Sequence, residues 1–302
     1  MVMLMDPNQM KIMPDIAESQ KSPINSTLKW VGMEKVAIPL FLKEQFRVPA
    51  KADIFVNVKE AEAKGIHMSR LFLALEEGFK NKPLSVSLVE DLLKSFVDSQ
   101  KGLSDAAKIV LVWEELLERK ALLSDYSGWK TYPVKLTAEL IKGVFEVNLS
   151  FSIFYSSTCP CSSALSRQLF QKAFAKEFCD DNLNFEKAFE WLGKNQIAAP
   201  HSQRSRADIS LILKTEESDF NILDYINALE SELKTPVQTA VKREDEQEFA
   251  RLNGENTMFV EDALRKMKKV MSDFKTVKNF EIKTHHYESL HAHDAVGVIS
   301  SQ

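Results

Sequence analysis

Cysteine and glycine are both scarce in this sequence, and each scarcity excludes a class of protein. Three cysteines in 302 residues make a poor disulfide framework, so we expect free thiols in a reducing compartment. With nine glycines, the chain contains neither GxxxxGK[ST] nor GxGxxG, the loops that cradle nucleotide phosphates. A phosphate group would therefore have to be held by side chains.

The sequence also lacks an excess of basic charge and a long apolar run. Its 39 basic and 43 acidic residues give a net charge of −4, which predicts neither a nucleic-acid partner nor an anionic membrane surface. The first apolar run is interrupted by Asp6 and Pro7, and no later stretch approaches the roughly 18 apolar residues of a membrane span. These absences predict a cytoplasmic protein, and a hydrophobic content of 44% is enough for a sizeable core.

The hydrophobic pattern predicts an α+β fold. Residues 1–28 are polar and contain three prolines, which indicates a flexible N-terminal arm before a folded region at 29–302. Pairs of strands alternate twice with pairs of helices, which favours antiparallel sheets with helices on one face. Period-two alternation predicts strands at 54–58, 134–140, 145–153, 207–213, 280–284 and 295–300. Helical spacing predicts helices at 67–79, from about 162, at 185–193, 222–233, 237–252 and 259–274.

Two of the cysteines, Cys159 and Cys161, flank a proline between a predicted strand and a predicted helix, which Ser162 or Ser163 is expected to cap. One intervening residue rarely lets both sulfurs bind the same ion in tetrahedral geometry, so at most one of them is expected to bind a metal. The alternative is a buried structural cysteine, which behaves as a small hydrophobe.

Histidines are concentrated near the C-terminus. Four of the six, His285, His286, His291 and His293, fall within nine residues. Imidazole is the commonest transition-metal ligand and titrates near neutral pH, so the cluster is a candidate for metal binding or proton transfer. A surface strand and loop rich in histidine is the alternative.

Carboxylates are dense between residues 241 and 265, and most of them would suit a solvated helix face. Glu246 stands out because Lys242 and Arg243 precede it and could meet an anionic ligand. Glu261 stands out because its neighbours are apolar, and a buried carboxylate requires a partner with hydrogen-bond donors. Guanine offers two adjacent donors, its ring N–H and its exocyclic amine.

Four cationic residues are candidates for binding phosphate. Lys64, His67 and Arg70 lie in "KGIHMSR", and Arg204 lies in "HSQRS". Their charge suits phosphate oxygens, with arginine able to bind them through two parallel hydrogen bonds. Each of them would also suit an ordinary exposed position.

Taken together, six stretches resemble the motifs of GTP cyclohydrolases of the IB type. They are "KGIHMSRL", "STCPCSSALS", "PHSQRS", "VKREDEQEFA", "NGENTMFVEDALR" and "ESLHAHDAV". The resemblance covers about residues 30–299. It implies the tunnelling fold, in which tandem antiparallel sheet and helix-pair units assemble into barrels, usually as a homotetramer. On this basis residues 29–302 form a bimodular catalytic domain, with a helical insertion at about 167–198 that shorter members lack.

The resemblance also implies an activity, namely the conversion of GTP and water to 7,8-dihydroneopterin triphosphate and formate, which serves folate-type or queuosine-type pathways. It implies that Cys159 is the catalytic thiolate and a metal ligand, and that Glu261 anchors the guanine edge. A divalent ion, Zn²⁺, Mn²⁺ or Fe²⁺, is expected to bind Cys159 and His201 and to lower the pKa of a water molecule. His291 or His293 is expected to move protons. Candidate metal ligands by this resemblance are Cys159, His201, Glu246, Glu288 and His291.

Two other functions remain open at this point. One is a non-catalytic purine- or pterin-binding scaffold in which Cys159, His201 and C-terminal histidines form a closed structural zinc site. The other is a different tunnelling-fold enzyme that acts on another purine or pterin. Turnover of GTP separates both alternatives from the cyclohydrolase.

Overall fold

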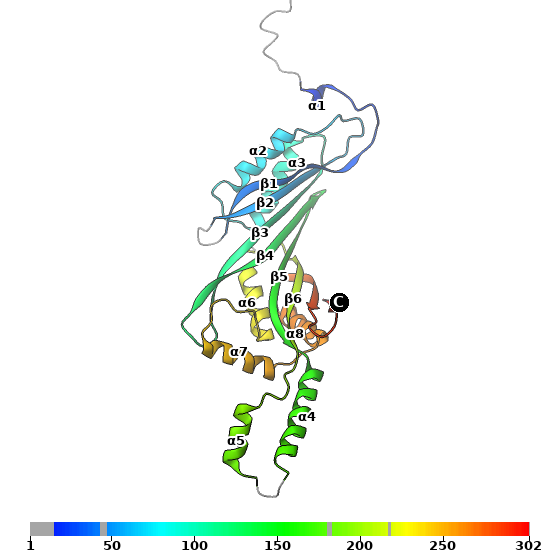
Figure 1. Ribbon diagram of the computed structural model, residues 1–302. Helices are drawn as coiled ribbons and strands as arrows, with labels where there is room; N and C mark the ends of the chain where they lie inside the picture. Colours follow the sequence, from blue (N-terminus) through cyan, green and yellow to red (C-terminus); the bar gives the residue numbers. More distant parts are fainter. Residues whose placement is uncertain (1–14, 43–46, 180–182, 217–218, 302) are drawn as a thin grey trace, which may run out of the picture. The chain divides into compact units, whose positions relative to one another are not determined.

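The computed structural model describes residues 15–42, 47–179, 183–216 and 219–301. Its strands form one eight-stranded sheet in chain order, β1 to β8, and the predicted α+β class with antiparallel strands is confirmed (Figure 1). The strands are β1 Leu28–Phe41, β2 Arg47–Val58, β3 Ala106–Lys120, β4 Ser127–Ile141, β5 Val144–Thr158, β6 Ser202–Leu213, β7 Val277–His286 and β8 Ala295–Ser300. The helices are α1 Ile16–Ser19, α2 Met68–Phe79, α3 Val86–Ser99, α4 Pro160–Glu177, α5 Phe185–Lys194, α6 Ile222–Leu233, α7 Arg243–Glu255 and α8 Val260–Ser272.

The predicted N-terminal arm is described only from residue 15 onward, because residues 1–14 lie outside the described residues. Within 15–28, α1 forms a single turn and Lys21 makes an isolated bridge with Ala63. Among the helices in the described part of the chain, none is both long and apolar enough to cross a membrane.

The chain divides into two compact units. Unit 1 comprises residues 1–114, 135–149 and 213–220, and unit 2 comprises 115–134, 150–212 and 221–302. In unit 1, burial alternates along β2, so that Ile54, Val56 and Val58 are buried, and α2 packs against β1 and α3. The two helices pack closely at Gly78, where a Cβ atom would lie 2.5 Å from Cδ1 of Leu92.

In unit 2, α6 packs against α8, and α8 packs against β7 and β8. The core beneath them holds three fully buried tyrosines, Tyr132, Tyr155 and Tyr225. The hydroxyl of Tyr132 donates a hydrogen bond to the buried carboxylate of Glu230 at 2.8 Å. The ammonium group of Lys130 forms an ion pair with the same carboxylate oxygen, also at 2.8 Å. The buried hydroxyl of Tyr132 and the carboxylate of Glu230 therefore satisfy each other.

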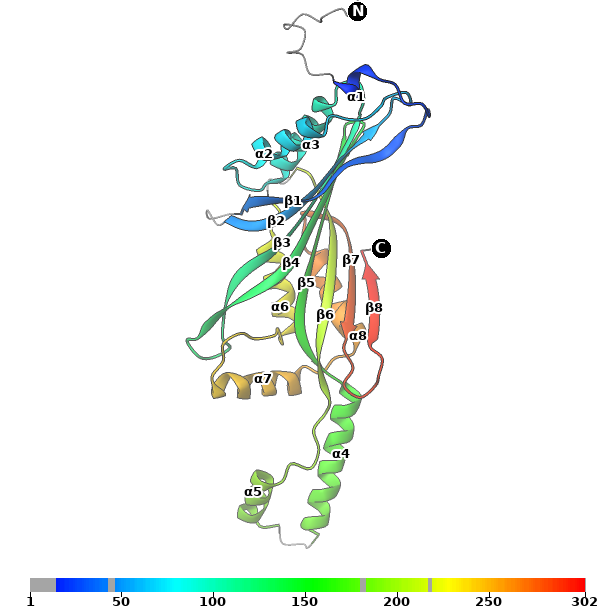
Figure 2. The same ribbon diagram turned by 45° about the horizontal axis from the view of Figure 1, so that its top comes forward.

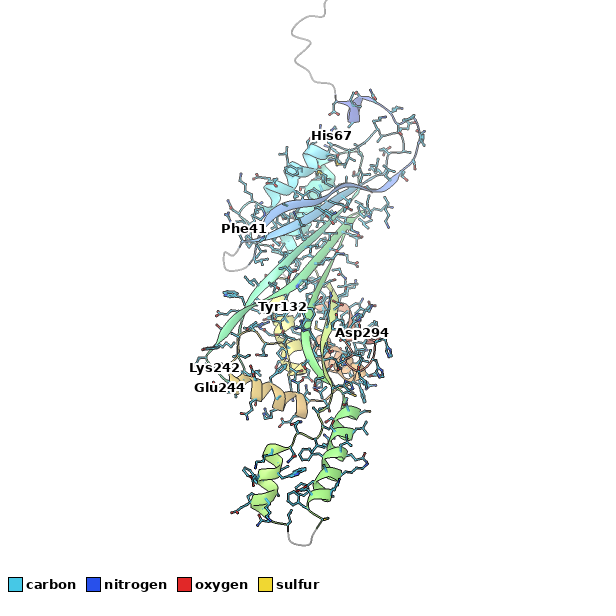
Figure 3. The ribbon with its side chains drawn as sticks, viewed as in Figure 1. Phe41, His67, Tyr132, Lys242, Glu244 and Asp294 are labelled. Atoms are coloured by element: carbon cyan, nitrogen blue, oxygen red, sulfur yellow. The ribbon has the colours of Figure 1, made fainter. Side chains whose placement is uncertain are left out.

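The start of α7 differs from the sequence-based prediction. The helix begins at Arg243, not at about 237, because Val237 to Lys242 run irregularly and Val237 N–H bonds to the carbonyl of Phe154 at 3.1 Å. Asp245 fixes the first turn: its buried carboxylate accepts hydrogen bonds from the backbone N–H groups of Lys242 and Leu123 at 2.8 Å each. Figure 3 marks this helix start with Lys242 and Glu244. The turn between β3 and β4 is thus tied to α7.

Candidate active site

The site begins where β5 ends and α4 starts. Cys159 is the N-cap of α4, and Pro160 is the first helical residue, where its fixed φ suits a helix and its missing N–H costs nothing. The prediction that Ser162 or Ser163 caps this helix is therefore wrong. The hydroxyl of Ser162 instead accepts a hydrogen bond from the N–H of His201 at 3.0 Å. Cys159 is half-buried, whereas Cys161 and Cys179 are exposed free cysteines.

His201 reaches the same place from the other side of the α4–α5 segment. The N–H of Cys159 donates to the carbonyl oxygen of His201 at 3.3 Å, which holds the two backbones together. The His201 ring lies beside Gln203, with 3.3 Å between Nδ1 and Oε1, and Gln203 donates through Nε2 to the buried hydroxyl of Ser157 at 2.9 Å. The position of the imidazole is thus fixed by Gln203 of β6, which is itself held by Ser157 of β5.

Glu288 approaches the imidazole of His201 from the end of β7. One carboxylate oxygen, Oε2, lies 3.9 Å from Nδ1 of His201, and the two side chains are only 14% and 21% exposed. The neighbouring N–H of Tyr287 donates to the carbonyl of Arg204 at 3.2 Å, so the register of β6 against β7 delivers Glu288. Sulfur, imidazole and carboxylate donors therefore come from three separate segments of unit 2.

The helices α7 and α8 are joined to the same end of β5. The N–H of Met258 donates to the carbonyl of Thr158 at 3.0 Å, and the side chain of Asn253 accepts a hydrogen bond from Ser156 at 2.6 Å. Glu261 therefore stands in the first turn of α8, on the segment that begins beside Cys159. Its side chain is exposed in the single chain, so the expectation of a buried carboxylate is wrong. The apolar neighbour that is buried is Leu264, on the core-facing side of α8.

Strands β5 and β7 also share a buried hydrogen-bond network that includes His286, a residue for which the sequence predicted no role. The hydroxyl of Tyr155 is 3.0 Å from Nε2 of His286 and 2.8 Å from the hydroxyl of Thr284, which donates to the carbonyl of Arg206 at 2.9 Å. Burial lowers the pKa of His286 to about 4, although the charge of Glu261 opposes the shift. His286 is therefore neutral at pH 7. The signal in the sequence was its place after Phe280, Ile282 and Thr284 on the inward face of β7.

Other predicted site residues of unit 2 lie on the surface of the single chain. The rings of His291 and His293 stack with centroids 5.0 Å apart on the exposed loop after β7, and Arg204 is exposed on β6. Glu246 is exposed in the first turn of α7. Asn253, which contacts β5, lies near the other end of this helix. The structure thus joins the backbones of Cys159 and His201 and brings the carboxylate of Glu288 toward the imidazole of His201, and it keeps Glu246 at the other end of α7.

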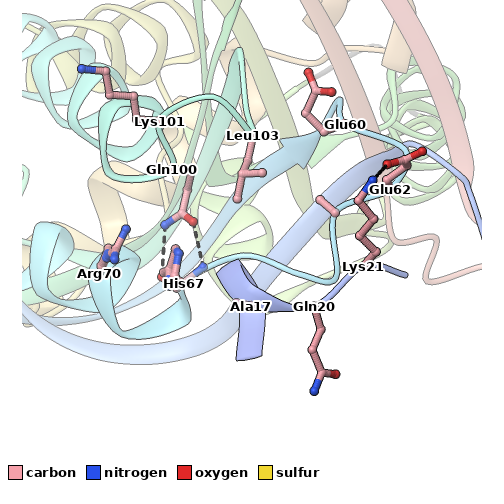
Figure 4. A pocket seen from close by; sticks show the side chains of 11 residues that line it. Ala17, Gln20, Lys21, Glu60, Glu62, His67, Arg70, Gln100, Lys101 and Leu103 are labelled. Atoms are coloured by element: carbon pink, nitrogen blue, oxygen red, sulfur yellow. Dashed lines mark hydrogen bonds and ion pairs between the residues drawn. The ribbon is translucent and has the colours of Figure 1, made fainter. Parts of the chain in front are cut away.

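The remaining predicted residues belong to unit 1. His67 and Arg70 line a pocket of about 300 Å³, and Lys64, which is exposed, is not part of its lining. Gln100, almost fully buried, fixes His67 by accepting a hydrogen bond from its N–H at 2.8 Å and donating to its carbonyl at 3.1 Å (Figure 4). Lys21 and Lys101 add positive charge to the pocket, and Lys21 is paired with Glu62. Glu60 and Glu62 line the same pocket, so its charge is mixed.

A divalent metal ion requires several protein ligands close together and of suitable chemistry. Among the described residues, no three His, Cys, Asp or Glu side chains are close enough together to hold a metal ion by themselves. The chemistry of the donors does fit, because thiolate, imidazole and carboxylate are the ligands of zinc and related ions, and His201 and Glu288 already approach each other.

Solved structures with the same arrangement of strands and helices define the class of protein. Uricase from Arthrobacter globiformis matches with a TM-score of 0.51 at 7% sequence identity, covering 91% of this chain and 93% of that one. Urate oxidase from Bacillus sp. TB-90 matches with a TM-score of 0.52 at 7% identity, covering 90% and 98%. At such low identity these matches concern the fold alone. The protein has the tunnelling fold.

Sequence comparison identifies the family within this class. The family model described as type I GTP cyclohydrolase folE2 matches residues 13–297. A protein named GTP cyclohydrolase FolE2 from Pseudoalteromonas translucida is 48% identical over 292 residues, covering 95% of this chain and 96% of that protein. Another of the same name from Hydrogenovibrio crunogenus is 42% identical over 293 residues, covering 95% and 94%. The chain belongs to the type I GTP cyclohydrolase FolE2 family.

Proposed function

We propose that the protein is a metal-dependent GTP cyclohydrolase that converts GTP and water to 7,8-dihydroneopterin triphosphate and formate. The observation that carries this proposal is the meeting of Cys159 and His201 at one strand end, in a chain that matches its family over residues 13–297. Membership of the family supplies the reaction, and the convergence of thiol, imidazole and carboxylate supplies a place for it.

The metal ligands in this proposal are Cys159, His201 and Glu288, with Glu246 and His291 as further candidates. A divalent ion, Zn²⁺, Mn²⁺ or Fe²⁺, supplies Lewis acidity that makes water nucleophilic at neutral pH when it is bound. The side chains of Glu246 and His291 are exposed in the single chain, which leaves both accessible to an ion bound by this chain or by a second subunit. Gln203 and the hydroxyl of Ser157 hold the imidazole of His201 in place.

The substrate in this proposal is held at its two ends. Glu261 accepts hydrogen bonds from the ring N–H and the exocyclic amine of guanine, a pairing that a carboxylate makes with both oxygens. Lys64, His67, Arg70 and Arg204 bind the triphosphate, and the pocket that His67 and Arg70 line supports this assignment because Arg70 and Lys101 bring positive charge to it, beside Glu60 and the Lys21–Glu62 pair. In this proposal the contacts of Glu261 orient the purine so that C8 faces the nucleophile.

Proton transfer in this proposal belongs to the loop after β7. Opening the imidazole ring of guanine leaves a nitrogen that must be protonated, and release of formate requires a second proton transfer. His291 and His293 are exposed on this loop, within the same segment that presents Glu288, so they reach solvent and substrate alike. We assign this shuttle to one of the two.

The proposed setting is a cytoplasmic homotetramer, built from tunnelling-fold barrels, that supplies a pterin precursor for folate-type or queuosine-type synthesis. The deciding experiment incubates the purified full chain with GTP and Zn²⁺, Mn²⁺ or Fe²⁺ and follows pterin fluorescence after oxidation. We expect fluorescence with at least one of these ions and none after chelation. Absence of fluorescence with every ion would contradict the proposed function.

A further inference from the structure

The pocket beside His67 is bounded on one side by the start of the described chain. Residues 15–22, which we call the N-terminal strap, include the single turn α1. Ala17, Gln20 and Lys21 of the strap line the pocket together with residues of α2 and of the turn after α3 (Figure 4). In both views of the ribbon, α1 lies beside the start of α2 and the end of α3 (Figures 1 and 2). The strap is therefore one wall of this pocket.

A carboxylate of the strap approaches an imidazole to which the proposed function assigns a phosphate group. Oδ2 of Asp15 lies 3.4 Å from Nδ1 of His67. The side chain of His67 is only 12% exposed, whereas that of Asp15 is 43% exposed. Because Gln100 holds the backbone of His67 through two hydrogen bonds, His67 does not need Asp15 to keep its place. Asp15 is therefore an anionic group of the chain itself, set against a residue that is fixed by other contacts.

The charges of the pocket indicate what Asp15 does there. The charged side chains that line the pocket, apart from the imidazole, are Lys21, Arg70, Lys101, Glu60 and Glu62. They carry one positive charge in excess. The carboxylate of Asp15 balances this charge from its place beside the imidazole. A pocket balanced in this way attracts an anion less strongly, and departure of Asp15 restores the positive excess.

The strap is held more firmly at one end than at the other. At its C-terminal end, the N–H of Ser22 donates to the carbonyl of Glu62 at 2.8 Å, and Lys21 forms an ion pair with the carboxylate of Glu62. The turn that carries Asp15 has weaker support, because a single helical turn is unstable by itself and Ile16, its largest apolar side chain, is 45% exposed. The Asp15 end can therefore leave the pocket while the Lys21 end stays in place.

We propose that the N-terminal strap competes with the phosphate chain of the substrate: Asp15 holds the imidazole of His67, and a phosphate group displaces it on binding. Binding of the phosphate chain releases the Asp15 end of the strap, and the strap in turn lowers the affinity of the pocket. This inference rests on the proposed function, because it concerns the pocket assigned there to the triphosphate. It adds that the chain contains its own competitor for that pocket.

The first test is calorimetric titration of the full chain with inorganic triphosphate, without GTP and without metal. We expect Asp15→Asn to lower the Kd about fivefold, the factor that a partly exposed ion pair accounts for. Glu60→Gln is the matched control, since it removes a carboxylate from the lining and leaves Asp15 against His67. We expect a gain of only about twofold from it. An unchanged Kd in Asp15→Asn, an equal gain in Glu60→Gln, or no binding by any of the three proteins would overturn the proposal.

The second test follows the strap itself and needs no substitution. Elastase cleaves after small residues, so its cleavage after Ala17, measured by mass spectrometry, reports opening of the turn α1. We expect saturating inorganic triphosphate to accelerate this cleavage at least threefold. Slower or unchanged cleavage would show that the strap closes over the anion or does not respond to it, and either result would overturn the proposal.

Neither test involves turnover, so the strap and the proposed function can fail separately. If triphosphate gives both expected results and GTP gives no pterin fluorescence with any metal, the strap assignment stands and the proposed function is wrong. If fluorescence appears and Asp15→Asn binds triphosphate as the wild-type chain does, the function stands and the strap assignment is wrong.

Discussion

The N–H of Cys159 donates a hydrogen bond to the carbonyl oxygen of His201 at 3.3 Å, although all of α4 and α5 lies between them in the chain. The pairing of β5 with β6 therefore sets the positions of Cys159 and His201. The α4–α5 segment between them begins and ends at the same end of these two strands. The helical segment could therefore change in length without moving the two residues. The candidate site is therefore positioned by the paired ends of β5 and β6, and not by α4 and α5.

Glu261 tests the guanine anchor. In Glu261→Gln the amide keeps one acceptor and brings a donor against the two donors of guanine, so we expect KM for GTP to rise at least tenfold at unchanged metal content. The measurement is steady-state turnover together with metal analysis of the purified variant. Glu255→Gln, an exposed carboxylate at the end of α7, is the matched control. Wild-type KM in Glu261→Gln would remove the guanine anchor.

Arg70 tests the triphosphate pocket. A hydrogen bond to a charged group is worth about 1.5–3 kcal/mol, so Arg70→Ala should weaken inhibition by inorganic triphosphate by roughly 10- to 100-fold. Lys80→Ala removes an exposed cation just after α2 and should leave inhibition unchanged. The measurement is the inhibition constant of inorganic triphosphate against GTP turnover. An unchanged constant in Arg70→Ala would place the phosphates elsewhere.

His286 gives the protein a pH-dependent stability. Its pKa is about 4 in the folded chain against the ordinary 6.5, so between these values the unfolded chain binds the proton first and the folded state loses stability as pH falls. The full effect is on the order of 3 kcal/mol at pH values below 4. His286→Gln keeps a hydrogen-bonding partner for Tyr155 and cannot titrate. Urea unfolding of metal-free protein at pH 7 and pH 4.5 should show a smaller loss in this variant, and an equal loss in both proteins would refute the assignment.

Several elements could be predicted from the sequence because their periodicity is regular. The helix at 222–233 and the strand at 295–300 have the predicted bounds, and the strands at 134–140 and 145–153 fall within β4 and β5. Four elements were not predicted: the single turn α1, β1, α3 and β3. In β1 the register against β2 shifts between Leu28 and Val31 and again between Met33 and Val36, which breaks the alternation. The buried residues of α3 do have helical spacing, so this helix was predictable from its pattern, whereas β3 begins as an unbroken apolar run without alternation.

The candidate site was less accessible to sequence reasoning than the fold. Motifs identified Cys159 and His201, but their backbone contact depends on strand pairing, and the approach of Glu288 to His201 depends on the register of β6 and β7. The side chain of Glu261 was expected to be buried because Phe259 and Val260 precede it. In the structure Phe259 is itself exposed, since these residues form the N-terminal end of α8, where local apolar neighbours do not imply burial.

The central claim is that the thiol of Cys159 is required for GTP hydrolysis, and formate release from GTP by Cys159→Ala tests it most directly. Circular dichroism and sedimentation should first show that this variant keeps the fold and assembly of the wild-type chain. The account predicts that metal-supplied wild-type protein releases formate and that Cys159→Ala releases none above the metal-only background. Formate release by Cys159→Ala at a rate comparable to wild type would contradict it.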